Sequence, residues 1–538
     1  MIDAESLHVE SKPERFYDDV SHAAGTPSFA EDIHDAAAQE HTLSLWHAIR
    51  LYPKSIAWSL VMSTAIIMEG YDTILLGSLY AQPAFAKAYG VPVGDGTYQL
   101  VAPWQSGLNS GSAIGQLAGL LIAGHLSEQL GFKKTMLGGL FACIALIFIT
   151  VFAPNITVLL VGQILFGIAL GIFQTIPCIY ALEVSPTSLH AYLTNYVNFC
   201  WTFGQIIATG LMRGVLYRTD EWAYRIPFAG QWFWPIILIP AITFAPESPW
   251  WLVRKGRLAD AKLALQRLTT KTAVGYDLDK SITLMVATTE RERRINSATS
   301  YWACFADAVN LRRTLIVIGV YIAQMLSGVF LRGYSSYFLI QAGLPADQAF
   351  NLSIVNFAVA ILGGFCSWIL LPLFGRRSIF LWSFVLMLIL LVIVGGLGVP
   401  SVPAGADNPY ARTIGAILIV SSFLYNCTMG PLTNTLCAEL PSALLRSKSL
   451  ALARWAYAFC AIIFGVIVPY QLNPTAWNWG AKTGFFWAGG CLVSILFTYF
   501  CLPEPKGRNT VELDILFEKR ISARKFAETR VDLTDAML

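Results

Sequence analysis

Residues 124–134 read Gly-His-Leu-Ser-Glu-Gln-Leu-Gly-Phe-Lys-Lys and directly follow an apolar run at about 106–126. A related stretch, Leu-Phe-Gly-Arg-Arg at 373–377, follows a second apolar run at about 349–371. Each stretch places a glycine and paired basic residues after a segment long enough to span a membrane. The two stretches lie about 250 residues apart, a spacing that suggests two copies of one helical unit.

Two further pairs repeat in the same register. Glu-Val-Ser-Pro at 183–186 corresponds to Glu-Leu-Pro-Ser at 439–442, and Pro-Glu-Ser-Pro at 246–249 corresponds to Pro-Glu-Pro-Lys-Gly-Arg at 503–508. One such coincidence would mean little. Three in register indicate duplicated halves, which is the parallel repeat of major facilitator transporters.

The composition requires that much of the chain faces lipid. Of the 538 residues, 55% are hydrophobic and 13% are charged, and the mean hydropathy is +0.55. So few charges cannot cover a soluble surface of this size, which excludes a soluble enzyme, a disordered chain and a collagen-like protein. Apolar runs near membrane-spanning length lie at about 56–80, 106–126, 135–153, 156–181, 192–216, 228–246, 313–338, 349–371, 378–399, 413–439, 450–470 and 483–502. We therefore predict an all-α membrane protein with the major facilitator fold, in which 12 transmembrane helices form two six-helix repeats.

Other classes of function lack support. The net charge of +3 gives no electrostatic basis for binding nucleic acid. The ten cysteines are scattered singly, mostly inside apolar runs, so we expect no metal site and no cofactor. Phosphate-binding loops of the GxxxxGK[ST] type are absent from the sequence, which disfavours an ATP-driven pump.

The distribution of basic residues predicts the orientation. Only six of the 37 Lys and Arg residues fall on one side of the predicted membrane, and two lie within spans. The six are Lys87, Arg213, Arg218, Arg225, Arg412 and Lys482. The positive-inside rule then puts both termini in the cytoplasm. The expected domains are an N-terminal tail (1–54), a first bundle (55–246), a cytoplasmic linker (247–312), a second bundle (313–502) and a C-terminal tail (503–538).

Four charged residues fall inside predicted spans, where charge is costly and usually functional. They are Glu69, Asp72, Arg332 and Arg454. Glu69 and Asp72 are three apart and share a helix face. A carboxylate that gains and loses an Arg partner changes its proton affinity, so we expect Asp72 to be the coupling site, with Glu69 assisting and Arg454 as counter-ion. The alternative is a static ion pair that fixes helix packing.

Polar side chains inside the spans could bind a neutral polyhydroxylated solute, because amides donate and accept hydrogen bonds and aromatic faces stack on sugar rings. The alternative for each amide is a hydrogen bond between helices. The predicted substrate-binding residues are Gln116, Gln163, Gln205, Gln324, Arg332, Tyr334, Tyr337, Asn356 and Asn434.

Charged residues at the cytoplasmic ends of the spans could form ion pairs that latch this face and break when the halves rock, since exposed pairs are individually weak. The alternative is that the basic residues serve only as topology signals. The predicted gate residues are Glu128, Lys133, Lys134, Glu183, Glu247, Arg376, Arg377, Glu439, Arg446 and Glu504.

These residues resemble the sugar porter branch of the major facilitator superfamily over about 45–527. Gly-Tyr-Asp at 70–72 resembles the span-one signature of proton-linked sugar porters. Pro-Glu-Ser-Pro-Trp-Trp-Leu at 246–252 resembles the PESPRWL signature, with Trp in place of its Arg. Gly-Arg-Arg at 375–377 and the motif at 503–508 resemble the GRR and PETKGR signatures.

Finer features resemble the fungal α-glucoside (maltose permease) group. They are Met-Glu-Gly-Tyr-Asp-Thr at 68–73, Tyr-Leu-Thr-Asn-Tyr-Val-Asn at 192–198, and the Asn-Pro-Thr-Ala-Trp stretch within 472–484. The resemblance implies a plasma-membrane proton symporter for α-glucosides such as maltose. It also implies that Glu69, Asp72 and Arg454 act in coupling, and that Gln205, Gln324, Tyr334 and Asn356 contact sugar.

The chain departs from the family pattern at several of these positions. The span-seven QQxxGxN pattern reads Gln-Met-Leu-Ser-Gly-Val-Phe at 324–330. Asn434 replaces a span-ten Trp, Gln163 replaces the span-four Arg of bacterial relatives, and Gln116 stands where the α-glucoside group often has an acid. Arg332 adds a positive charge, so an acidic or otherwise unusual glycoside becomes an alternative substrate.

The sequence therefore predicts a secondary transporter working by alternating access, not an enzyme, with a sugar, protons and the lipid bilayer as its partners and a monomer as its state. Three alternatives stay open: an importer or exporter of a non-sugar metabolite, a facilitated uniporter, and a non-transporting nutrient sensor.

Overall fold

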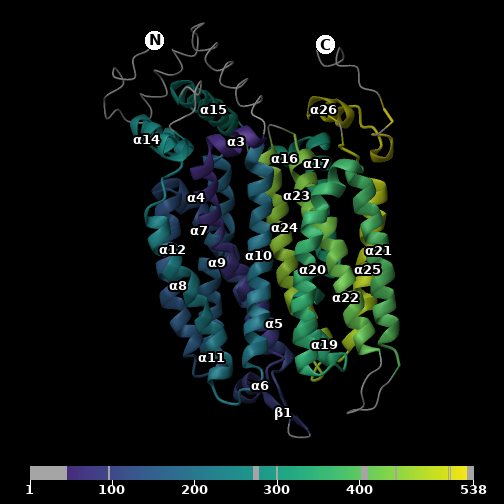
Figure 1. Cartoon of the computed structure of the whole chain (residues 1–538). Helices are drawn as coiled ribbons and strands as arrows, with labels where there is room; N and C mark the ends of the chain where they lie inside the picture. The colour runs from purple at the N-terminus through teal and green to yellow at the C-terminus, as the bar shows by residue number, and fades with distance from the viewer. Residues whose placement is uncertain are drawn as a thin grey trace.

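The computed structural model describes residues 45–94, 97–270, 278–298, 301–400, 410–442, 445–506, 508, 510–526 and 528–529. Figure 1 shows two groups of long helices side by side, the purple-to-teal first half and the green-to-yellow second half. Short helices cover the end of the bundle where the first and last described residues lie, here called the terminus end. A small β-hairpin marks the opposite end, here called the hairpin end. The predicted tail segments 1–44 and 530–538 lie outside the described residues.

Six spans form the first half. In chain order they are α4 (Pro53–Ser63) with α5 (Ile66–Leu79), α7 (Ala102–Leu130), α8 (Phe132–Val151), α9 (Ile156–Val184), α10 (Thr187–Val215), and α11 (Trp222–Ala229) with η1 (Gly230–Trp232) and α12 (Phe233–Thr243).

Six further spans form the second half. They are α17 (Ala308–Leu326) with α18 (Val329–Gly333) and α19 (Ser335–Gln341), α20 (Ala346–Leu373), α21 (Arg376–Leu397), α22 (Ala411–Cys427) with α23 (Met429–Glu439), α24 (Arg446–Leu472), and η2 (Gly480–Lys482) with α25 (Thr483–Cys501). The 12-helix, two-repeat prediction is confirmed.

Shorter elements lie at the two ends. The terminus end carries α3 (Leu45–Leu51), α13 (Pro249–Arg254), α14 (Leu258–Leu268), α15 (Leu278–Ala298), α16 (Ala303–Ala306), α26 (Thr510–Glu518) and η3 (Ala523–Lys525). The hairpin end carries α6 (Pro83–Tyr89), β1 (Val91–Gly94) and β2 (Thr97–Gln99). The two strands pair antiparallel, with Val91 opposite Gln99.

Within the described ranges, ten helices are both long and apolar enough to cross a membrane. The remaining two, α7 and α10, are 29 residues each but carry more polar and small residues. Both lie where the halves meet, since α7 packs on α24 and α10 packs on α20. A helix buried in such a seam needs less apolar surface than one surrounded by lipid, because small and polar residues favour contact between membrane helices.

Close packing inside the first half depends on glycine. A Cβ atom on Gly115 of α7 would lie 2.1 Å from the carbonyl oxygen of Ile164 on α9. Real Cβ atoms do not approach oxygen so closely, so any larger residue would force α7 and α9 apart. Small residues at such crossings let backbones approach in membrane proteins, where dispersion contacts replace the hydrophobic effect between helices.

Hydrogen bonds join the two halves near the hairpin end. The Ser106 hydroxyl of α7 donates to the Val466 carbonyl of α24 at 3.0 Å. The Asn473 amide donates to the Leu100 carbonyl at 2.7 Å, and Arg213 Nε donates to Asn351 Oδ1 at 3.1 Å. The halves are thus tied together at this end.

Candidate functional site

Glu69 lies where the two halves meet. It is on α5, its exposed fraction is 6%, and its carboxylate accepts a 2.9 Å hydrogen bond from Gln174 Nε2 on α9. Arg454, on α24 of the opposite half, interacts with Glu69 electrostatically. An acid of one half therefore attracts a base of the other, although the two form no direct ion pair among the described residues. Rocking of the halves would change the strength of this attraction.

Arg454 lies against aromatic rings and is exposed to solvent, although it belongs to a membrane-spanning helix. Its guanidinium carbon is 5.0 Å from the Tyr321 ring centroid and 5.8 Å from that of Tyr457. The Tyr321 hydroxyl donates to Asn434 Oδ1 at 3.3 Å, and Asn434 is exposed as well. Because Arg454 faces both Glu69 and these rings, its exposure indicates that solvent reaches between the halves.

Asp72 has different surroundings from Glu69. It is 1% exposed, and its carboxylate accepts a 2.9 Å hydrogen bond from Gln231 Nε2 of η1. Ser112 of α7 interacts with the same carboxylate and accepts a 3.5 Å hydrogen bond from Gln116. These contacts all come from the first half, so Asp72 lies inside that bundle. Its link to Gln116 brings two predicted residues together.

A second cluster forms in the other half, around Tyr425 of α22. The guanidinium carbon of Arg332 lies 4.1 Å from the Tyr425 ring centroid, a cation–π contact. Gln324 Nε2 donates to the Tyr425 hydroxyl at 2.9 Å. Arg332 is 7% exposed, and its Nη2 has no hydrogen-bond partner. Gly328, with φ of +78°, breaks the span between Gln324 and Arg332 and so sets their relative orientation.

The predicted residues Tyr334 and Tyr337 meet Tyr80 across the halves near the hairpin end. The Tyr80 and Tyr334 rings are stacked with centroids 6.3 Å apart, and Tyr337 meets Tyr80 edge-on at 6.3 Å. Gln105 Nε2 donates to the Tyr337 hydroxyl at 3.4 Å. The Tyr334 hydroxyl is buried without a partner. These rings close the space between α5 and α19.

Three other predicted binding residues are buried without such contacts. Gln163 on α9 is fully buried with both amide atoms unpartnered, and Asn356 on α20 has an unpartnered Oδ1. Gln205 on α10 is 5% exposed. Within the described ranges, no hydrogen bond joins these three to the other predicted binding residues.

The predicted gate residues of the first half form one network. Glu247 accepts backbone hydrogen bonds from Phe132 (3.0 Å) and Lys133 (3.4 Å), at the first residues of α8. Glu183 at the end of α9 accepts from Arg254 at 2.7 Å and from the Ser248 hydroxyl. Burial raises the pKa of Glu247, although the neighbouring backbone N–H groups oppose the rise.

The second half repeats this arrangement. Glu504 accepts backbone hydrogen bonds from Arg376 (2.8 Å) and Arg377 (3.0 Å), at the start of α21. Arg376 also pairs with Glu439 at 3.5 Å. In the first half Phe132 occupies the position of Arg376, and Glu183 pairs with Arg254 of the linker instead. The Glu183–Arg254 pair thus joins the first half to the linker, and the Arg376–Glu439 pair lies within the second half.

The other predicted gate residues have smaller parts in this network. The Glu128 carbonyl accepts from the Trp251 indole at 2.9 Å, while its side chain is exposed. Lys134 is exposed, and the Nε of Arg446 has no hydrogen-bond partner.

Several contact residues were not predicted. Gln174 and Gln231 bind the two membrane carboxylates, and Tyr321, Tyr425 and Tyr457 surround the two arginines. The same signal that selected Gln163, an amide inside an apolar run, was present at Gln174. Among the described residues, no cluster of His, Cys, Asp and Glu could hold a metal ion.

The chain matches the family described as Sugar (and other) transporter over residues 58–517. It is 39% identical over 507 residues to the general alpha-glucoside permease of Saccharomyces cerevisiae, which covers 93% of this chain and 81% of the relative. It is 40% identical over 512 residues to the maltose permease MAL61 of the same species, with coverages of 93% and 82%. The solved inward-open xylose transporter XylE of E. coli superposes with a TM-score of 0.68 at 17% identity, over 86% of this chain and 99% of XylE.

Proposed function

Because the chain belongs to the sugar transporter family of the major facilitator superfamily, we propose that it carries α-glucosides such as maltose across a membrane together with protons. The chain is a multi-pass membrane transporter, not an enzyme. The observation that supports the coupling is the electrostatic attraction between Glu69 of the first half and Arg454 of the second. The relatives named α-glucoside and maltose permeases supply the substrate class.

In the proposed cycle, Glu69 and Asp72 bind the coupled proton and Arg454 supplies the counter-charge. Protonation of a carboxylate beside Arg454 removes the attraction between the two groups and so weakens one tie between the halves. The halves then rock about the bound sugar, and deprotonation on the other side restores the contact. Tyr334 and Tyr337 close the hairpin end around Tyr80, and the sugar binds between the amides and aromatic rings of the two halves.

The proposed location is the plasma membrane, with both termini and the linker in the cytoplasm and one chain per transporter. The clustering of Lys and Arg on the terminus end supports this orientation. The ion pairs Glu183–Arg254 and Arg376–Glu439 then lie on the cytoplasmic face. Because neither pair joins the two halves, each would stabilise its own side of this face rather than break when the halves rock.

Uptake of radiolabelled maltose by a yeast strain that lacks its own α-glucoside transporters tests this function. The proposal expects accumulation above the outside concentration, loss of that accumulation with a protonophore, and acidification of the cell as sugar enters. Accumulation that survives the protonophore would contradict proton coupling. Equilibration without accumulation would indicate a facilitated uniporter, and no uptake would favour a sensor.

Arg332 favours a second candidate function, transport of an acidic or otherwise modified glycoside. This buried guanidinium has an unpartnered Nη2 and contacts an aromatic ring. A carboxylate on the substrate would satisfy it with a charge-assisted hydrogen bond. Competition of maltose uptake by a glucuronide-type glycoside tests this candidate against the first.

A further inference from the structure

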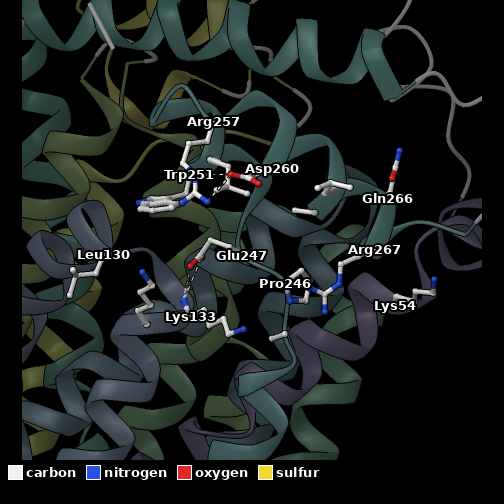
Figure 2. A pocket seen from close by; sticks show the side chains of 15 residues that line it. Lys54, Leu130, Lys133, Pro246, Glu247, Trp251, Arg257, Asp260, Gln266 and Arg267 are labelled. Atoms are coloured by element: carbon white, nitrogen blue, oxygen red, sulfur yellow. Dashed lines mark hydrogen bonds and ion pairs between the residues drawn. The ribbon is translucent and has the colours of Figure 1, made fainter. Parts of the chain in front are cut away.

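A pocket of about 710 Å³ lies at the terminus end of the first half, away from the seam between the halves. The chain segments that line it include the start of α4, the turn between α7 and α8, the segment between α12 and α13, and the linker helices α13 and α14. Figure 2 shows Trp251, Arg257 and Asp260 along one side, and Lys133, Glu247, Arg267 and Lys54 along the other. Its size is that of a ligand-binding pocket.

The pocket wall is strongly basic. Five basic residues line the pocket, whereas only two of its lining residues are acidic. The basic residues are Lys54, Lys133, Lys134, Arg257 and Arg267, and the acidic ones are Glu247 and Asp260. Both acids are already engaged. Asp260 accepts a 2.7 Å hydrogen bond from Arg257, and Glu247 accepts from the backbone at the start of α8.

Among the described residues, the other four cations of the pocket form no ion pair, although Glu247 attracts Lys133 electrostatically. Lys133 Nζ donates to the Thr243 carbonyl at 2.6 Å, and Arg267 donates to the Phe244 carbonyl at 2.7 Å, so both contact neutral groups. Lys133 and Arg267 are also close enough to repel each other. An anion between them would relieve this repulsion.

The pocket lies at the depth of lipid headgroups. Lys54 and Lys133 stand in the first turns of candidate spans Pro53–Leu79 and Phe132–Val151, and the span Trp222–Thr243 ends beside it. Leu130 and Leu263 line the pocket yet are 46% and 57% exposed. Basic cations with apolar side chains beside them, at the ends of spans, suit a phosphate headgroup that remains attached to acyl chains.

We propose that this pocket binds the phosphorylated headgroup of an anionic phospholipid, of the phosphoinositide class. Lys54, Lys133, Lys134 and Arg267 contact the phosphates, and Leu130 and Leu263 face the start of the acyl chains. The occupied pocket would hold the linker helices against the first half. This proposal rests on the membrane location of the chain and on its proposed orientation, and it is independent of the transported solute.

The test uses the purified full chain in detergent and three probes: dioctanoyl phosphatidylinositol 4-phosphate, dioctanoyl phosphatidylcholine, and inositol 1,4-bisphosphate. Binding is measured from the shift in melting temperature with probe concentration. We expect saturable binding of the phosphoinositide and no saturable binding of phosphatidylcholine. Equal affinity for the phosphoinositide and for inositol 1,4-bisphosphate would overturn the lipid assignment in favour of a soluble phosphorylated ligand.

Lys54→Gln/Arg267→Gln locates the binding in the pocket. Removing two cations at a headgroup site should weaken phosphoinositide binding roughly 10- to 30-fold. The matched control, Lys87→Gln/Lys482→Gln, removes two exposed lysines at the hairpin end and should leave the affinity within about twofold. Unchanged binding by the pocket variant would overturn the proposal.

A third variant acts in the opposite direction and guards against loss of folding in the double variant. Asp260→Asn removes an acid and frees Arg257 from its ion pair, so it should tighten phosphoinositide binding several-fold. An affinity that does not rise would contradict the proposal that the positive charges of the pocket bind the phosphorylated headgroup. None of these outcomes depends on sugar uptake, so failure here and failure of the transport proposal are distinguishable.

Discussion

Glu69 and Asp72 lie one helical turn apart on α5, yet their carboxylates have different partners. Glu69 accepts a hydrogen bond from Gln174 and is attracted electrostatically by Arg454 of the opposite half, whereas Asp72 accepts a hydrogen bond from Gln231 within its own half. Only a contact between halves changes when the halves rock as rigid bodies. We therefore expect Glu69 to sense the position of the second half, and Asp72 to act as a proton-binding group inside the first.

A double-mutant cycle on maltose exchange separates these roles. Glu69→Gln and Arg454→Gln remove the two sides of one electrostatic interaction, so their effects should be non-additive by about 0.5–3 kcal/mol. Asp72→Asn should abolish uphill accumulation while exchange persists, and its effect should add to that of Arg454→Gln within about 0.5 kcal/mol.

The measurement is the initial rate of radiolabelled maltose exchange in vesicles, beside accumulation in cells at acidic pH. Full accumulation by Asp72→Asn would contradict its role in coupling. Additivity of Glu69→Gln with Arg454→Gln would contradict the electrostatic interaction between the halves as the coupling element.

At Arg332 we expect a change of specificity more than a change of folding. Arg332→Leu removes the charge above Tyr425 and leaves a shorter apolar side chain in the buried position. Loss of a charge-assisted hydrogen bond should weaken uptake of an acidic glycoside by roughly tenfold or more. Uptake of maltose, glucose and a glucuronide, measured with melting temperature, checks this result. Arg332→Lys is the control that keeps the charge, and an unchanged uptake panel for Arg332→Leu would contradict the expectation.

At the scale of single elements, the packing of α7 against α9 requires that the two backbones approach each other closely. Gly115→Ala would place a Cβ 2.1 Å from the Ile164 carbonyl oxygen, whereas Gly107→Ala on the same helix meets no heavy atom within 4 Å. Overpacking of this kind costs about 1–3 kcal/mol. We expect a lower melting temperature and less folded protein for Gly115→Ala alone. Equal melting temperatures for the two variants would mean that the crossing is not close packed.

Glu247, which binds the start of α8, should make the stability of the protein depend on pH. Burial raises the pKa of Glu247 above its ordinary value of 4.5. The folded protein therefore holds this proton more tightly than the unfolded chain. This tighter proton binding contributes fully to folding stability at pH values below the ordinary pKa of Glu247. The contribution is lost as the pH rises through the raised pKa of the folded protein.

Glu247→Gln has no such titration. The variant should therefore gain stability relative to the unmodified chain as pH rises from about 4 to about 7. Thermal unfolding across this range measures the difference, and Glu518→Gln, at an exposed position on α26, controls for the loss of one carboxyl group. A difference in melting temperature that stays constant with pH would show that Glu247 does not titrate in this way.

At the scale of the molecule, the sequence predicted the repeat well because its signals are local. Glycine turns, paired basic residues and acidic residues at span ends recur in both halves, and the structure uses them alike, as Glu247 at α8 and Glu504 at α21 show. The partners of the buried charges could not be predicted. Asp72 and Gln231 are 159 residues apart, and their contact depends on how three helices are rotated in the bundle.

The same limit applies to the gate. The sequence placed Glu183 near basic residues, but its pairing with Arg254 follows from Phe132 occupying the position that Arg376 has in the other half. The difference between Phe132 and Arg376 can be seen in the sequence. To predict the resulting Glu183–Arg254 pair, however, one must know the position of α13, which patterns in a single sequence do not give.

The tie between the halves at the hairpin end predicts a measurable shift in conformation. Ser106→Ala deletes the hydroxyl that donates to Val466 of the opposite half. A hydrogen bond of this kind contributes about 1 kcal/mol, so its loss should raise the population open at this end roughly fivefold. Ser127→Ala is the matched control, because the Ser127 hydroxyl donates to Gly124 within the same helix. The control should leave the populations unchanged.

Spin labels at Lys87→Cys on α6 and Lys482→Cys in η2 report the separation of the halves at this end, after the exposed native Cys501 is replaced by Ser. Pulsed electron–electron double resonance then gives the distribution of distances between the two labels in nanodiscs. The long-distance population should grow in Ser106→Ala and stay constant in Ser127→Ala. If both variants keep the distribution of the unmodified chain, this hydrogen bond does not hold the hairpin end closed, and the aromatic contacts of Tyr80 with Tyr334 and Tyr337 must supply the closure.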